Sequence, residues 1–191
     1  GDFADAFGLC FGQWNSMDDE AGDPYDYDVR VAGSPDPFAA MFAALRNLLT
    51  NESLRHSLGV GNRTWVSMDG TDPHNPVTAH MVQDFVAPTV APLLGPILDA
   101  GIRVHFYAGQ FDVSPCNHLG LVEFLERLEW HGQADFAASR RRRWAIDGVN
   151  VGFVRSGGGL SWTLVERAGH LVPHDAPHAA YDLLQSFLRG D

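Results

Sequence analysis

Two ionisable residues each follow a short apolar segment of the chain. Asp112 comes shortly after segment 102–108, and His170 comes shortly after segment 160–167. Both segments are typical of β-strands, and in open α/β sheets ligands bind beyond the carboxyl ends of the strands. A carboxylate beside an imidazole can fix the tautomer of the ring while the second ring nitrogen takes a proton from a nucleophile. The alternative is structural: Asp112 caps a helix and His170 fills a turn.

The nucleophile that such a pair serves is not found in this sequence. An aspartate followed by a histidine is the second half of the Ser…Asp…His order of α/β-hydrolases. No serine lies in a G-x-S-x-G motif, and Ser114, in Asp-Val-Ser-Pro-Cys, lacks the flanking glycines. Either the serine is on another polypeptide, or the protein is not a hydrolase.

Residues near Asp112 and His170 also suggest two other kinds of site, a metal site and a cysteine nucleophile. Donor types that bind metals cluster near the C-terminus at His170, His174, Asp175 and His178. Side chains four residues apart face together only on a helix, and two prolines interrupt this stretch, so we expect neither a metal nor another cofactor. Cys116 is a possible nucleophile, but cysteines serve more often as small buried hydrophobes or as disulfide partners.

The elements that must position these residues alternate between helix and strand, which indicates the α/β class. Apolar residues at helical spacing predict helices, and short apolar runs bounded by glycine predict strands. The turn Ser156–Gly159 predicts a hairpin because its glycines adopt positive φ. The predicted helices are 37–49, 52–58, about 77–86, 118–129, 134–143 and 178–188, and the predicted strands are 102–108, 149–155 and 160–167, with a loop at 168–177.

The composition excludes several classes of protein. The 191 residues are 45% hydrophobic and 19% charged, which fits one folded domain rather than a disordered chain. All 13 basic residues are arginine, so chemistry that needs a lysine is excluded within this chain. A net charge of -11 argues against nucleic acid and anionic membranes as partners. We interpret the cluster Arg140–Arg143 as a solvated or protease-accessible stretch.

Further signals concern the cellular compartment. The longest uncharged run, 85–98, is too short to span a bilayer and contains three prolines. No signal peptide is predicted at the start, and a first residue other than Met indicates an N-terminus made by processing or by cloning. Sequons at Asn51 and Asn62 predict glycosylation and favour the secretory pathway.

Four segments carry a resemblance to a known family: V-H-F-Y-A-G-Q-F-D at 104–112, L-E-W-H-G-Q-A-D-F at 128–136, V-G-F-V-R-S at 151–156 and A-G-H-L-V-P-H-D-A-P at 168–177. They resemble the C-terminal part of serine carboxypeptidases of the cathepsin A and vitellogenic-like type. The likeness extends more loosely from about Tyr25 to the end. It implies the C-terminal portion of an α/β-hydrolase fold with part of the helical cap region.

The resemblance implies roles for four residues. Asp112 and His170 match the family's triad aspartate and histidine. Leu171 falls where the family lines the pocket for the leaving residue, and Cys116 lies near a family cysteine beside the acyl pocket, one residue further from the aspartate. The nucleophilic serine, the oxyanion-hole amides and the groups that bind the substrate's terminal carboxylate belong to the family's N-terminal part.

The implied activity is release of C-terminal amino acids from peptides through an acyl-enzyme, without a cofactor. Several family members are cut into two associated chains, so the expected partner is an N-terminal chain that carries the serine, and the two-chain unit could itself dimerise. The expected divisions are 1–36 as an N-terminal loop segment, 37–100 as a helical cap-side region and 101–191 as part of the hydrolase core. Cys10 and the acidic loop 17–28 would contact or cross-link the other chain. The expected location is the lysosome, the vacuole or the extracellular space.

Two alternatives remain open. The same fold and triad serve acyltransferases that use sugar-ester donors, and a member of the family could also act as a non-catalytic structural or interaction protein. If this chain is the smaller part of a larger hydrolase, we expect it to be unstable when expressed alone.

Overall fold

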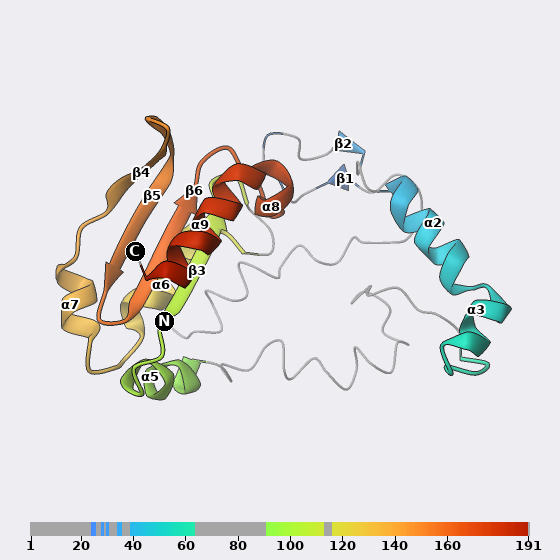
Figure 1. Cartoon of the computed structure of the whole chain (residues 1–191), viewed down its shortest axis with the longest axis horizontal. Coiled ribbons are helices and arrows are strands. Elements are labelled where there is room, and N and C mark those ends of the chain that lie inside the picture. The colour runs from blue at the N-terminus through green and yellow to red at the C-terminus, as the bar shows by residue number, and fades with distance from the viewer. Residues whose placement is uncertain are drawn as a thin grey trace.

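The computed structural model describes residues 24–25, 28, 30, 34–35, 39–63, 91–112 and 116–190 (Figure 1). Cys10, Ser114 and the helix predicted at 77–86 lie outside the described residues. The elements in chain order are β1 (Pro24–Tyr25), β2 (Ser34–Pro35), α2 (Ala39–Leu49), α3 (Glu52–Ser57), α5 (Ala91–Asp99), β3 (Val104–Gly109), α6 (His118–Arg127), α7 (Gln133–Ala138), β4 (Arg142–Ile146), β5 (Val149–Gly157), β6 (Leu160–Val165), α8 (Val172–Asp175) and α9 (Pro177–Arg189).

Four strands form one mixed sheet in the order β3-β6-β5-β4. β3 and β6 are parallel, with Val104 opposite Leu160 and Gly109 opposite Val165, whereas β5 is antiparallel to both of its neighbours. Because β3 and β6 run in the same direction, their carboxyl ends lie on the same side of the sheet, and the loops that follow them lie together. Among the described strands β3 pairs with β6 alone, so its other edge is open.

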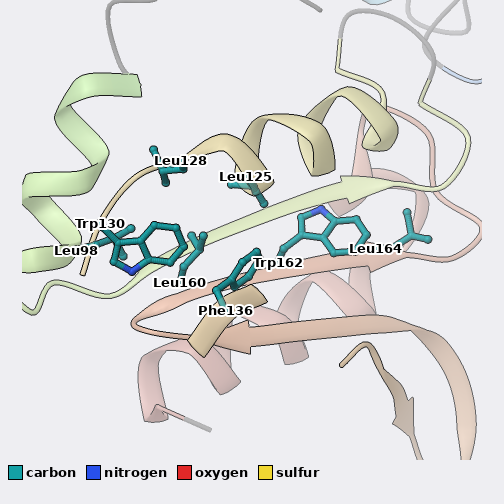
Figure 2. Close-up of a cluster of buried hydrophobic side chains, with 8 residues drawn as sticks. All are labelled: Leu98, Leu125, Leu128, Trp130, Phe136, Leu160, Trp162 and Leu164. Atoms are coloured by element: carbon teal, nitrogen blue, oxygen red, sulfur yellow. The ribbon is translucent and has the colours of Figure 1, made fainter. Parts of the chain in front are cut away.

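Side chains of β6 alternate between two hydrophobic clusters. Leu160, Trp162 and Leu164 face α5, α6 and α7 in the larger cluster (Figure 2). Val165 points to the opposite face, where it packs with buried residues of α8 and α9. Helices therefore cover both faces of the sheet, but only the face of β6 toward α5, α6 and α7 is apolar throughout, because Ser161 and Thr163 precede Val165 on the other face. The predicted α/β class is confirmed.

The hairpin between β5 and β6 forms as the glycine-rich turn predicts. Gly158 and Gly159 have φ of 57° and 83°, values that glycine adopts without a steric cost. A Cβ atom on Gly158 would lie 2.2 Å from the carbonyl oxygen of Gly132. The turn therefore needs glycine for its backbone conformation and for its close packing against the start of α7.

The helix predicted at 134–143 is wrong in its second half. Helix α7 ends at Ala138, and Arg142 and Arg143 belong to β4, which pairs with β5. Pairing with a neighbouring strand outweighs the helical propensity of arginine, which is a weak preference. The four arginines at 140–143 are all exposed, as expected of a solvated stretch, and the guanidinium of Arg141 in addition lies 4.8 Å from the centre of the Phe153 ring.

Helix α5 forms although it contains two prolines. Pro92 lies in the first turn, where its missing N–H costs nothing, while Pro96 lies inside the helix. Packing compensates: a Cβ atom on Gly95 would lie 2.4 Å from the carbonyl oxygen of Glu129, and Leu98 is buried in the larger cluster. No helix is predicted at 91–99 because proline normally ends a helix.

The short strands β1 and β2 pair with each other within the segment 1–36 predicted as a loop, and most of the remaining elements differ from the predictions only at their ends. Helix α6 is two residues shorter than predicted, β6 ends before Arg167, and the predicted loop 168–177 contains the short helix α8. Helix α2 has helical apolar spacing, yet Met41 and Leu48 are exposed in the described part of the chain. No helix among the described residues is long and apolar enough to cross a membrane.

Candidate active site

The structure brings Asp112 and His170 into contact. Nδ1 of His170 lies 2.9 Å from Oδ2 of Asp112, although the two residues are 58 positions apart in the chain. An ionised carboxylate only accepts hydrogen bonds, so Nδ1–H donates to it and Nε2 is the basic nitrogen of the neutral ring. The Asp112 residue is 4% exposed, whereas the His170 side chain is 29% exposed. The buried acid therefore orients a histidine that is open on one side.

The two loops touch each other through their backbones. A Cβ atom on Gly109 would lie 2.0 Å from the carbonyl oxygen of Gly169 and 2.5 Å from that of Ala168. Only glycine fits at such a distance, because real Cβ atoms do not approach a carbonyl oxygen this closely. Gly109 thus permits the approach that places Asp112 beside His170.

Hydrogen bonds continue the pairing of β3 and β6 into these loops. The backbone N–H of Gln110 donates to the carbonyl of Val165, and that of Phe111 donates to the carbonyl of Ala168, both at 2.9 Å. The side-chain oxygen of Gln110 accepts from the N–H of Arg167 at 3.2 Å. Arg167, two residues after the end of β6, has a φ of 62° and turns the chain toward His170.

The histidine loop is held from its far side by Asp175. Oδ2 of Asp175 accepts from the backbone N–H of Gly169 at 2.7 Å, and Oδ1 lies 2.9 Å from Nδ1 of His174. Asp175 therefore closes a turn around His170. No group of three or more His, Cys, Asp or Glu residues that could hold a metal occurs in the described part of the chain.

An ion pair that the sequence did not indicate lies against both loops. Asp28 and Arg30 bind each other through several hydrogen bonds, and Nη2 of Arg30 donates to the carbonyl of Arg167 at 3.1 Å. The guanidinium of Arg30 lies 4.3 Å from the centre of the Phe111 ring. The hydrogen bond from Arg30 lowers the pKa of Asp28, and the same bond raises the pKa of Arg30.

The environment of Asp112 contains a second histidine. Burial lowers the pKa of His118, the positive charge of Arg141 lowers it further, and the negative charge of Asp112 raises it. His118 opens helix α6, whose N-cap is Asn117. Oδ1 of Asp112 is buried and has no hydrogen-bond partner among the described residues.

The other predicted site residues lie as follows. Leu171 is the half-buried residue between His170 and helix α8, and Cys116 is exposed one residue before the N-cap of α6. Asn51 is the N-cap of α3, where its side-chain oxygen accepts from the N–H of Leu54 at 3.0 Å. Asn62 is exposed. Leu171 adjoins the Asp112–His170 pair in sequence and in space, while the two asparagines belong to the region of α3.

Comparisons with known proteins agree with one another. The serine carboxypeptidase family model matches residues 23–190. The chain is 31% identical to serine carboxypeptidase 3 of Oryza sativa subsp. japonica over 97% of this chain and 35% of that protein. It is 33% identical to vitellogenic carboxypeptidase of Aedes aegypti over 76% of this chain and 30% of that protein.

A solved structure shows the same fold. The Saccharomyces cerevisiae protein Kex1(delta)p, a prohormone-processing carboxypeptidase, matches with a TM-score of 0.62 and 16% identity, over 88% of this chain and 37% of that one. The architecture is the C-terminal portion of an α/β-hydrolase fold, as the sequence motifs predict. The chain spans about a third of the length of the first curated relatives and of this structure.

Proposed function

Because the chain belongs to the serine carboxypeptidase family, we propose that it is the C-terminal portion of a serine-type carboxypeptidase and supplies the aspartate and histidine of its triad. The contact of 2.9 Å between His170 and Asp112 carries this proposal. Their location at the carboxyl ends of two parallel strands supports it, since that edge is where α/β enzymes bind ligands. The serine is supplied by the rest of the protein, which this chain does not include.

The proposed reaction proceeds through an acyl-enzyme. The serine hydroxyl attacks the carbonyl carbon of the last peptide bond, and Nε2 of His170 takes the serine proton. His170 gives that proton to the amine of the leaving amino acid as the peptide bond breaks, and an ester remains on the serine. Water then attacks the ester, again losing its proton to Nε2, which returns it to the serine. Asp112 holds the ring and stabilises its cation in both steps.

The pocket residues and the compartment are further parts of this proposal. Leu171 directly follows His170, at the position where the family lines the pocket for the released residue, and we assign it to that pocket. We assign Cys116 to the acyl side because, in the resemblance to the family, it lies near a cysteine beside the acyl pocket, one residue further from the aspartate. The sequons at Asn51 and Asn62 are on exposed residues, which supports glycosylation and a secretory or lysosomal protein.

Replacement of His170 tests the proposal in the assembled protein, meaning this chain with the part that carries the serine. We expect His170→Ala to lower the rate of hydrolysis of a blocked dipeptide by roughly 10⁴-fold or more, because loss of one triad member removes proton transfer. The control is His131→Ala, at a side chain that is 92% exposed and lies outside both loops, which should retain activity within about threefold. Co-purification of the two parts should be unchanged in both variants.

Three results would contradict the proposal. Undiminished hydrolysis in His170→Ala would exclude its role as the base. Transfer from an acyl-glucose donor without hydrolysis of the dipeptide would indicate an acyltransferase. A remaining part that lacks a G-x-S-x-G serine would indicate a non-catalytic protein.

A further inference from the structure

We propose that Arg30, held by Asp28, is a positioning residue that locks the two loops carrying Asp112 and His170 in their active arrangement. This inference rests on the proposed function, because it assigns Arg30 a role in the same Asp112–His170 pair. Arg30 does not touch the reacting atoms. It acts through Phe111 and Arg167, one residue in each loop.

Several hydrogen bonds hold the ion pair together, and the Arg30 side chain is 43% exposed. The backbone N–H of Arg30 donates to Oδ1 of Asp28 at 2.8 Å, and Nε donates to Oδ1 and Oδ2 at 2.9 and 3.0 Å. Nη2 also donates to Oδ2. A planar guanidinium bound through two nitrogens to one carboxylate has a fixed orientation. Asp28 is 4% exposed, so this anchor is buried rather than free to move in solvent.

From that anchor the guanidinium contacts both loops. Its carbon lies 4.3 Å from the centre of the Phe111 ring, and Phe111 directly precedes Asp112. Nη2 donates to the carbonyl of Arg167, which lies three residues before His170. Arg30 and Arg167 are 137 positions apart, so a third segment of the chain ties together two loops that the sheet alone has already brought close.

Arg167 is the point at which the histidine loop depends on this contact. Its φ of 62° is a strained conformation for a residue with a side chain, and it determines the direction in which the chain leaves β6. The N–H of Arg167 is bound by Gln110 and its carbonyl is bound by Arg30. With both groups satisfied, the turn has one arrangement. Without Arg30, the peptide after Arg167 can rotate, and the ring of His170 moves with it.

The charges of the Asp28–Arg30 pair favour its persistence at low pH. The hydrogen bond from Arg30 holds the pKa of Asp28 below its ordinary value, so the pair stays ionised at a lower pH than an isolated aspartate would. Asp175, which closes the turn around Gly169, adds a second favourable charge and helps to raise the pKa of Arg30. The positioning contact is therefore kept at pH values at which most exposed carboxylates begin to take up protons.

The test uses the assembled protein and removes the pair as a unit. The single variant Arg30→Met would leave the buried carboxylate of Asp28 without a partner. The double variant Asp28→Asn/Arg30→Met removes both charges and so leaves no unpaired buried charge. Arg30→Lys keeps the charge but loses the planar contacts to two partners at once. The matched control is Arg155→Met, because Arg155 also binds a carboxylate, donates to carbonyls and covers a phenylalanine ring. All of those partners belong to α6 and α7.

We expect the double variant to lower kcat by about 10- to 100-fold while KM changes by less than about threefold, since a displacement of about 1 Å has effects of that size on catalysis. Arg30→Lys should show an intermediate loss. Arg155→Met should lower the melting temperature without changing kcat. A second readout is the far-downfield proton resonance of the Nδ1–H of His170 bound to Asp112, which should broaden or disappear in the double variant and persist in Arg155→Met.

The outcomes separate the two proposals. In the first outcome the parent protein is active and His170→Ala inactivates it, but the double variant changes neither kcat nor the proton resonance. This result overturns the positioning role and leaves the proposed function intact. An inactive parent protein, or full activity in His170→Ala, overturns the proposed function and with it the role of Arg30. Loss of kcat and of the resonance in the double variant, with both retained in Arg155→Met, supports the positioning role.

Discussion

A decrease in pH from 7 to 4 is expected to weaken this fold through His105, a residue of β3 outside the candidate active site. Nδ1 of His105 lies 2.6 Å from the hydroxyl of Ser161, and its ring lies 5.8 Å from that of Phe187 on α9. Nε2 is buried and has no hydrogen-bond partner among the described residues. Burial lowers the pKa of His105 from 6.5 to about 4.

The sign of the effect follows from this lowered pKa. Between about pH 6.5 and about pH 4 the unfolded chain binds a proton at His105 that the folded chain does not bind. The folded state therefore loses stability progressively as the pH falls through this range. At about 1.4 kcal/mol per pH unit, the gap between the two pKa values corresponds to a loss of about 3 kcal/mol. The described residues that line the cavity beside His105 include Arg103, Arg142 and Arg143 but no carboxylate, so no negative charge among them favours protonation of the His105 ring.

Urea unfolding of the assembled protein at pH 7 and pH 4 measures this loss. The variant His105→Gln keeps a polar group beside Ser161 but cannot be protonated, so we expect its loss of stability on acidification to be about 3 kcal/mol smaller than that of the parent protein. The control is His131→Gln, at a side chain that is 92% exposed, which should match the parent. An equal loss in His105→Gln and the parent would refute the argument.

Two further predictions concern single positions. Gly109→Ala should lower the free energy of unfolding by about 1–3 kcal/mol and the rate of hydrolysis by at least about tenfold, because its Cβ would force apart the loops of Asp112 and His170. The control Gly101→Ala, at positive φ in open space, should lower the free energy of unfolding by about 1–2 kcal/mol and leave kcat unchanged. Equal losses of kcat in the two variants would count against the loop argument. Asn51→Asp and Asn51→Ala should each remove one glycan, seen as a shift in mass, but only the alanine variant should lose about 1 kcal/mol, because aspartate still accepts from the N–H of Leu54. An unchanged mass in both variants would show that Asn51 carries no glycan.

The parts of the fold that local signals determine could be predicted from the sequence. Strands β3 and β6 are apolar runs bounded by glycine or by a turn, and the hairpin at Gly158 and Gly159 needs the positive φ that glycine permits. The placement of Asp112 and His170 near each other followed from two such strands ending at one edge. These features depend on a few neighbouring residues, which is the range over which a sequence pattern carries information.

The parts that depend on distant partners could not be predicted. Strand β4 contains two arginines and becomes a strand through its pairing with β5, and α5 persists with Pro96 because Gly95 packs against the backbone of Glu129. The Asp28–Arg30 pair lies in a stretch whose sequence indicates only a loop. Its significance comes from a carbonyl 137 positions away, and no local periodicity can indicate such a contact.

The position of β6 in the sheet also determines when the two loops can meet during synthesis. Val104 pairs with Leu160, so β3 leaves the ribosome 56 residues before its partner, a delay of roughly 3 to 11 s at about 5–20 residues per second. Strands β4, β5 and β6 follow one another closely and can pair as they emerge, since local contacts form faster than distant ones. Among the described strands, β3 therefore has no partner until β6 has emerged, and the Asp112–His170 pair cannot form before that point.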